Sequence, residues 1–160
     1  MAEPLYRSSL PWKAEHGSAL VIYCSDSRFG GPTEEFLQRY LGVGPIDRFI
    51  VPGGAGWLVL REGTLREYDV ARKSLNFLVE HHGLRRILLV AHCGCGFYQA
   101  LQPEASEAER RALQEADLQE AARVLSAWFA GISVAAYYAN VVEGKVVFEG
   151  VQGEIGEVLK

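Results

Sequence analysis

Two runs of consecutive apolar residues constrain the fold of this chain more than any other feature of its sequence. Residues 18–24 read SALVIYC and residues 86–91 read RILLVA, without the alternation of apolar and polar positions that a half-exposed strand shows. Such runs are typical of parallel strands that are buried on both faces of a sheet. A helical pattern of apolar residues at 65–82, ended by Gly83, lies between them in the chain. Strands that alternate with helices predict a mostly parallel sheet with helices on both faces.

Weaker patterns complete the predicted order of elements. The remaining strands are expected at 47–51, 132–142 and 145–148, and the remaining helices at 33–41 and 103–131. Thr33 is the expected N-cap of the first helix, and Ser106 with Glu109 is the expected capping box of the second. The Gly-rich stretch 25–32 is expected to be a loop. The predicted fold class is a three-layer α/β fold, with a mostly parallel central sheet of four strands plus a C-terminal hairpin strand.

Composition and charge exclude several classes of function. The chain has 160 residues, 49% of them hydrophobic and 22% charged, which fits one globular domain at 18–160. An apolar arm at 1–17 precedes this domain and is expected to pack either on it or on a second subunit.

The net charge of -4 argues against a nucleic-acid partner, and no apolar run reaches the roughly 18 residues that span a membrane. The first ten residues lack the pattern of a secretory signal, so we expect a cytoplasmic protein.

Thiol and imidazole groups follow the two buried strands, at the places where parallel sheets bind ligands. Cys24 ends the first strand and His92 follows the strand at 86–91, so both are expected at the carboxyl edge of the sheet. Cys95 lies three residues after His92, beyond a glycine, and can turn back toward the same point. Two thiolates and one imidazole suit Zn²⁺, and three protein ligands leave the fourth position of a catalytic zinc site open. Cys93 is a weaker candidate, because adjacent side chains at a strand end point apart.

Two other interpretations of these residues stay open. In a purely structural one, Cys24 and Cys93 are small apolar core residues and His92 caps a strand. In a catalytic one, Cys93 is a nucleophile on a phosphate-binding loop, as in cysteine phosphatases. That loop needs an arginine six residues after the cysteine to hold the phosphoryl oxygens, and Gln99 stands there. The combination of thiols and imidazole after two buried strands favours the metal site over both.

A charged pair follows the first proposed ligand. Asp26 and Arg28 lie two residues apart, directly after Cys24, and opposite charges this close are expected to pair. The pair either rigidifies the loop or serves the metal site. In the second case, the guanidinium holds the carboxylate away from the metal and keeps it ionised, so that a free oxygen accepts a hydrogen bond from zinc-bound water or hydroxide.

Together these motifs resemble the β-class carbonic anhydrases. Cys-x-Asp-x-Arg after a first buried strand and His-x-x-Cys after a later one stand in that family's order, and residues 75–96 look like its helix, strand and zinc turn. The resemblance implies zinc ligands and a catalytic dyad, which are Cys24, His92 and Cys95 for the metal and Asp26 and Arg28 for the dyad. It also implies a homodimer or a higher homo-oligomer, in which an N-terminal segment crosses to the partner.

One segment departs from the family pattern. The family usually has Arg-Asn-Ala-Gly after the second strand, where residues 53–56 of this chain read GGAG. These glycines form a flexible turn, or else they let backbone amides approach an anion. The departure concerns the side of the predicted site that would face the substrate.

The activity that the resemblance implies is the reversible hydration of CO2 to bicarbonate by a zinc-bound hydroxide, which makes the chain a zinc lyase with a small-molecule substrate. Two alternatives remain. The same site could hydrolyse a sulfur analogue of CO2, which is equally small and linear. The domain could also be a zinc-bearing binding or regulatory module without turnover, an alternative that the altered segment at 53–56 motivates.

Overall fold

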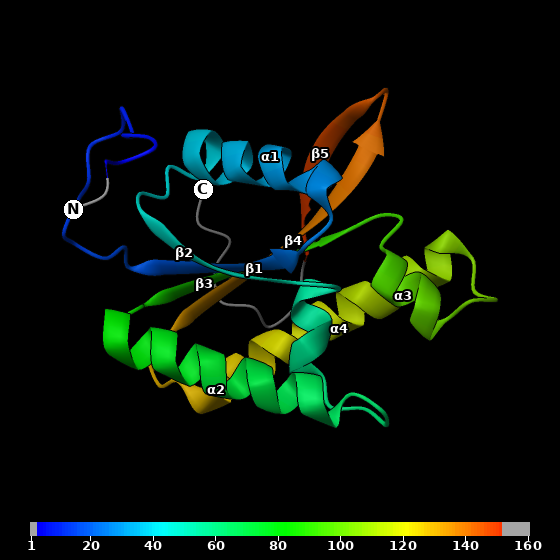
Figure 1. The fold of residues 1–160 in the computed structure, drawn as a ribbon. Coiled ribbons are helices and arrows are strands. Elements are labelled where there is room, and N and C mark those ends of the chain that lie inside the picture. Colours follow the sequence, from blue (N-terminus) through cyan, green and yellow to red (C-terminus); the bar gives the residue numbers. More distant parts are fainter. Residues whose placement is uncertain (1–2, 152–160) are drawn as a thin grey trace.

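Five strands form one sheet in the structure, which is a computed structural model and describes residues 3–151. The strands span Ala19–Cys24 (β1), Ile46–Val51 (β2), Arg86–His92 (β3), Ser133–Val142 (β4) and Lys145–Gly150 (β5). They lie side by side in the order β2-β1-β3-β4-β5 (Figure 1). The first four strands are parallel, and β5 pairs antiparallel with β4. The prediction of four parallel strands plus a C-terminal hairpin strand is therefore confirmed.

The central strands β1 and β3 are those with uninterrupted apolar sequences. All six residues of β1 are buried, as are six of the seven residues of β3. The edge strand β2 instead alternates between exposed and partly buried positions along most of its length. The difference follows from the strand order, because helices cover both faces of a central strand and neighbouring strands cover both its edges.

Helices cover both faces of the sheet, as predicted. α1 (Ser27–Glu35) lies on one face, and α2 (Leu65–His82) and α4 (Glu107–Trp128) lie on the other (Figure 1). One apolar core fills the side of α2 and α4, and a smaller one fills the side of α1. Three short helical segments complete the fold, namely η1 (Phe36–Tyr40), η2 (Gly54–Leu58) and α3 (Gly96–Leu101). None of the helices within residues 3–151 has the length and apolar character needed to cross a membrane.

The expectation of a loop at 25–32 is wrong, because residues 27–32 belong to α1. Asp26, and not Thr33, is the N-cap of this helix, since its carboxylate accepts a hydrogen bond from the Arg28 amide at 3.0 Å. Thr33 lies inside the helix and is fully buried. Two glycines and Pro32 lower the helix propensity of this stretch, and burial of its inner face against the sheet outweighs that cost.

The helix expected at 103–131 is shorter than predicted, since α4 spans Glu107–Trp128. Its capping box is confirmed: Ser106 Oγ accepts from the Glu109 amide, and the Glu109 carboxylate accepts from the Ser106 amide. The hairpin between β4 and β5 is confirmed as well. Both of its turn residues adopt positive φ, as a tight hairpin turn of two residues requires.

The N-terminal arm exposes its apolar side chains to solvent. The exposed fractions are 105% for Leu5, 81% for Tyr6, 79% for Leu10 and 87% for Trp12. None of the four therefore packs on the described part of its own domain. The division of the chain into an arm at 1–17 and a domain at 18–160 stays a prediction, and residues 1–2 and 152–160 lie outside the described residues.

The direction in which strands are added to the sheet reverses between β1 and β3. From β1 the chain crosses to β2 on one side, and it then returns to the other side of β1 to form β3. Cys24 is the last residue of β1 and His92 is the last residue of β3, so both lie at the carboxyl edge where the order reverses. Open α/β sheets bind their ligands at such points.

Candidate metal centre

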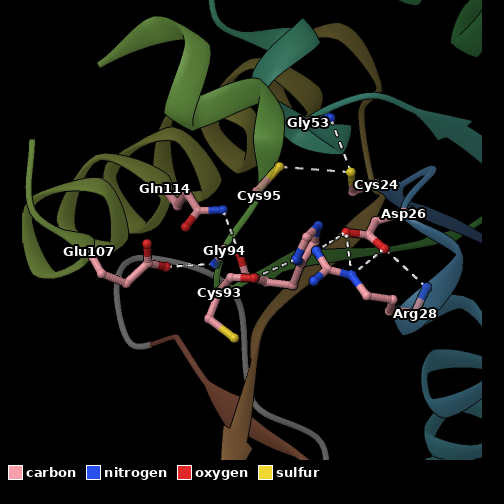
Figure 2. A network of polar contacts seen from close by, with 10 residues as sticks. Cys24, Asp26, Arg28, Gly53, Cys93, Gly94, Cys95, Glu107 and Gln114 are labelled. Atoms are coloured by element: carbon pink, nitrogen blue, oxygen red, sulfur yellow. Dashed lines mark hydrogen bonds and ion pairs between the residues drawn. The ribbon is translucent and has the colours of Figure 1, made fainter. Parts of the chain in front are cut away.

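Cys24, His92 and Cys95 meet at the carboxyl edge of the sheet. All three are buried, and their ligating atoms lie within 4.8 Å of one another. β1 and the adjacent β3 position the first two, while Cys95 is the N-cap of α3. Gly94 turns the chain back toward the cluster with a φ of +63°, a conformation that favours glycine. Cys93 is only partly buried, and its sulfur points away from the other two (Figure 2).

The spacing of the donor atoms fits one zinc ion. The Sγ atoms of Cys24 and Cys95 are 3.8 Å apart and face each other (Figure 2). Two sulfurs bound tetrahedrally to one zinc ion at about 2.3 Å each would lie about 3.8 Å apart. His92 offers its Nε2, which is buried and, within residues 3–151, has no hydrogen-bond partner. A buried polar atom left unsatisfied costs about 1–3 kcal/mol, and ligation of a metal would remove that cost.

The other ring nitrogen and a stacked ring fix the orientation of His92. Nδ1 donates to the Cys93 carbonyl oxygen at 2.8 Å, which leaves Nε2 as the nitrogen available for a metal. The Phe29 ring stacks on the imidazole with the two centroids 4.1 Å apart. Phe29 belongs to α1, in the stretch expected to be a loop, and this contact exists only because that stretch is helical and packs on the sheet.

Hydrogen bonds within the cluster set the protonation of the two thiols. The contact with Cys95 lowers the pKa of the Cys24 thiol to about 4, and the Gly53 amide contributes by donating to Cys24 Sγ at 3.3 Å. The same contact between the sulfurs, together with burial, raises the pKa of the Cys95 thiol. The two sulfurs therefore share one proton, and a divalent cation would displace it because the thiolate is the form that binds metal.

Asp26 and Arg28 form the expected ion pair beside the cluster. Arg28 Nη2 lies 2.5 Å from Asp26 Oδ2, and Arg28 Nε lies 3.0 Å from Oδ1 (Figure 2). These hydrogen bonds lower the pKa of Asp26 to about 2, so the carboxylate is ionised at neutral pH. The Asp26 side chain is 18% exposed and that of Arg28 is 69% exposed. The pair therefore lies between the buried cluster and solvent.

Side chains of α4 hold the turn that carries two of the proposed ligands. Gln114 Nε2 donates to the His92 carbonyl oxygen at 2.9 Å, and the Glu107 carboxylate accepts from the Gly94 amide at 2.6 Å (Figure 2). Sequence reasoning missed both contacts, because a polar residue in a helix does not indicate which backbone group it faces. The low exposure of Gln114, 1%, becomes meaningful only once the helix is docked.

The segment at 53–56 is an ordered part of the site, so the expectation of a flexible turn is wrong. All four of its residues are buried, it leads into η2, and its Gly53 amide donates to Cys24 Sγ as described above. A Cβ at Gly53 would lie 2.4 Å from the Phe97 ring, and one at Gly54 would lie 2.9 Å from the Tyr23 carbonyl carbon. Both glycines also have positive φ. Close packing of this backbone therefore excludes a larger residue at Gly53 or Gly54, and Phe97 fills the space beside Gly53.

The fold and the cluster define an α/β protein with a candidate metal centre at the carboxyl edge of a parallel sheet. Residues 14–151 match the model of a protein family described as "Putative carbonic anhydrase", so the chain belongs to that family. Together with the structural matches, this confirms the resemblance to the β-class carbonic anhydrases. No curated protein is significantly similar to the chain in sequence.

Solved structures of β-carbonic anhydrases share the fold at low sequence identity. The β-carbonic anhydrase CafA of Aspergillus fumigatus superposes with a TM-score of 0.56 at 18% identity, over 87% of this chain and 78% of its own. A tetrameric β-carbonic anhydrase from Sordaria macrospora gives 0.54 at 14% identity, over 84% and 81%. The β-carbonic anhydrase isoform I of Trichomonas vaginalis gives 0.54 at 15% identity, over 89% and 87%. At these identities the likeness concerns the fold alone.

Proposed function

We propose that this protein is a zinc-dependent carbonic anhydrase, which catalyses the reversible hydration of CO2 to bicarbonate. The observation that carries the proposal is the convergence of Cys24, His92 and Cys95 on one point, with a sulfur spacing that suits a single zinc ion. Membership of a carbonic anhydrase family supports the reaction. A set of three protein ligands supports a catalytic rather than a structural metal, because structural zinc sites have four.

The proposal gives Asp26 and Arg28 separate tasks. When bound, zinc supplies the nucleophile for CO2 by making water acidic near neutral pH. The Asp26 carboxylate, ionised at that pH, accepts a hydrogen bond from the attacking water and orients it. Arg28 binds both carboxylate oxygens, and so prevents the carboxylate from rotating freely.

Stopped-flow measurement of CO2 hydration on zinc-loaded protein tests the proposal. We expect a rate that is lost when a chelator removes the zinc and that returns when zinc is added back. A sulfur analogue of CO2 is assayed on the same preparation, and zinc-dependent turnover of the analogue alone would reassign the substrate. Stoichiometric zinc without turnover of either compound would indicate a binding or regulatory module instead.

We further propose that the protein is a homo-oligomer, at least a dimer, and that it is cytoplasmic. The exposed apolar side chains of the arm support an interface with a second copy, because large apolar groups left in water are typical of association surfaces. The Sordaria macrospora protein of the same fold is described as tetrameric. A reducing compartment suits the free thiols of the cluster, which must stay reduced to bind a metal.

A further inference from the structure

A buried carboxylate on α4 joins two segments, one that carries Cys95 and one that contacts Cys24. Asp117 is 3% exposed and belongs neither to the proposed zinc ligands nor to the proposed dyad. Tyr98 Oη donates to Asp117 Oδ2 at 2.7 Å, and Arg61 Nη2 donates to Oδ1 at 2.6 Å. Each oxygen of the carboxylate thus holds a different part of the chain, and the arginine compensates its charge.

The Tyr98 side of this network is connected to Cys95. Cys95 is the N-cap of α3, and Tyr98 lies three residues later, in the first turn of that helix. The Tyr98 side chain is 2% exposed and packs in a small cluster with Cys24 and Cys95. A hydrogen bond that fixes the Tyr98 hydroxyl therefore also fixes the first turn of α3 and the backbone that carries the Cys95 sulfur.

The Arg61 side of the network is connected to Cys24. Arg61 follows η2, and the residue before η2 is Gly53, whose amide donates to Cys24 Sγ at 3.3 Å. Within η2, Gly56 lies so close to the tyrosine that a Cβ there would be 2.9 Å from the Tyr98 hydroxyl oxygen. The ion pair of Arg61 therefore ties the segment that contacts Cys24 to α4.

We propose that Asp117 is a positioning residue for the metal centre. It holds Cys95 through Tyr98 and Cys24 through Arg61, and so maintains the 3.8 Å separation of the two sulfurs that one zinc ion requires. The inference rests on the proposed metal centre and adds a group that touches neither metal nor substrate. An apolar residue would avoid the cost of burying a charge, but it would not hold two segments by directional bonds.

Two conservative variants of the full-length protein test the role of Asp117. Tyr98→Phe removes only the hydroxyl, and Asp117→Asn removes only the charge. We expect zinc to bind about 10-fold more weakly in both, at the low end of the range for loss of a direct partner of a metal ligand, because Tyr98 and Asp117 act on the ligands through the backbone. Competition with a chromogenic chelator measures the affinity. Glu120→Gln is the matched control, because Glu120 also pairs with an arginine on α4 but has a side chain that is 41% exposed.

Cobalt substitution separates positioning from a general loss of stability. Co²⁺ bound by two thiolates and one imidazole absorbs visible light, and its bands report the geometry of the ligands. At a temperature where every variant is folded, we expect the bands to change in Tyr98→Phe and Asp117→Asn and to stay unchanged in the control. The losses of affinity in Tyr98→Phe and Asp117→Asn are expected to be less than additive in the double variant, because both substitutions act on the hydrogen bond between Tyr98 and Asp117.

Wild-type zinc affinity and cobalt spectrum in Tyr98→Phe, whatever its melting temperature, would overturn the positioning role. This variant decides the matter if Asp117→Asn does not fold. A wild-type protein that binds no zinc would remove the proposed metal centre and this inference with it. Failure to hydrate CO2 would leave both readouts unaffected, so failure of the proposed activity and failure of the positioning role are distinguishable.

Discussion

At the scale of single residues, the three cysteines have different environments. Cys24 and Cys95 are buried and face each other, whereas Cys93 is partly exposed and points away. We therefore expect Cys95→Ala to lose stoichiometric zinc on dialysis and Cys93→Ala to keep it, because a site left with two protein ligands holds zinc weakly. Elemental analysis of the dialysed proteins measures this. Full zinc content in Cys95→Ala would contradict the ligand assignment.

Asp26 has two roles that one substitution separates. It caps α1 through the Arg28 amide, and its ionised carboxylate belongs to the proposed dyad. Asparagine caps helices about as well as aspartate, so Asp26→Asn is expected to preserve folding and zinc binding. We expect the stopped-flow rate of CO2 hydration to fall about 10²- to 10⁴-fold, the usual range for a residue that handles a proton. Asp69→Asn, at an exposed ion pair on α2, is the control, and equal rates in the two variants would argue against the dyad.

The proposed ligands could be predicted from the sequence, whereas the residues that support them could not. Residues that end two buried parallel strands share one edge of the sheet, which is why Cys24 and His92 were expected to meet. Phe29, Gln114 and Asp117 reach the site from helices on opposite faces of the sheet. Their contacts depend on how those helices dock, and no local sequence pattern records that.

At the scale of elements, η2 depends on a close approach of its backbone to β1. Gly54 has a φ of +53°, and a Cβ there would lie 2.9 Å from the Tyr23 carbonyl carbon. We expect Gly54→Ala to lower the free energy of unfolding by about 1–3 kcal/mol, because backbone strain and a clash both oppose it. Gly30→Ala, inside α1 with open space at its Cβ, is expected to raise it by about 0.5–1 kcal/mol. Urea denaturation measures both, and a neutral Gly54→Ala would contradict the packing argument.

An ion pair between α1 and β2 gives the fold a defined response to acid. Arg48 donates to both oxygens of Glu34, at 2.6 Å each, and these bonds lower the pKa of the Glu34 carboxyl. The folded-state pKa lies below the unfolded one, so the stabilisation is fully present above the unfolded pKa, about 4.3, and is lost as the pH falls through the folded-state value. We expect Glu34→Gln to cost about 0.5–1 kcal/mol at pH 7, since the pair is partly exposed, and less at pH 3.

Chemical denaturation at the two pH values measures the cost of Glu34→Gln. Glu35→Gln is the matched control, because Glu35 is the next residue of α1 and pairs with Arg39 at a more exposed position. A cost for Glu34→Gln that is the same at pH 7 and pH 3 would show that the carboxylate charge does not contribute.

Elements with a strong apolar pattern could be predicted from the sequence, and short or glycine-rich helical segments could not. β1, β3 and α2 each carry a strong apolar pattern, and all three lie within about a residue of their expected bounds. α1 contains Gly-Gly-Pro, so its helix depends on packing against the sheet rather than on propensity. η2 and α3 contain five and six residues, which is too short for a period to show.

At the scale of the whole molecule, the strand order determines where chemistry can lie. β1 stands between β2 and β3. The connection from β1 to β2 crosses one face of the sheet through α1, and the connection from β2 to β3 crosses the other face through α2 (Figure 1). The carboxyl ends of β1 and β3 therefore lie at the edge where a ligand can enter. The sequence predicts that such an edge exists, because buried strands joined by helical crossovers are parallel. It does not predict that β1 and β3 are neighbours, since the order of the strands depends on how each crossover packs on the sheet.

The exposed arm leads to a prediction about assembly. Trp12 is 87% exposed, and a tryptophan buried at an interface is among the residues that contribute most to binding. We expect the full-length protein to sediment as a dimer or a larger assembly, and Trp12→Ala to raise the dissociation constant at least about tenfold.

Lys13→Ala, at the next position of the arm, is the control. A monomer at every concentration, or a Trp12→Ala variant that assembles like wild type, would show that the arm is not part of an interface. Zinc content across the same dilution series is expected to stay constant, because one chain supplies all three proposed ligands.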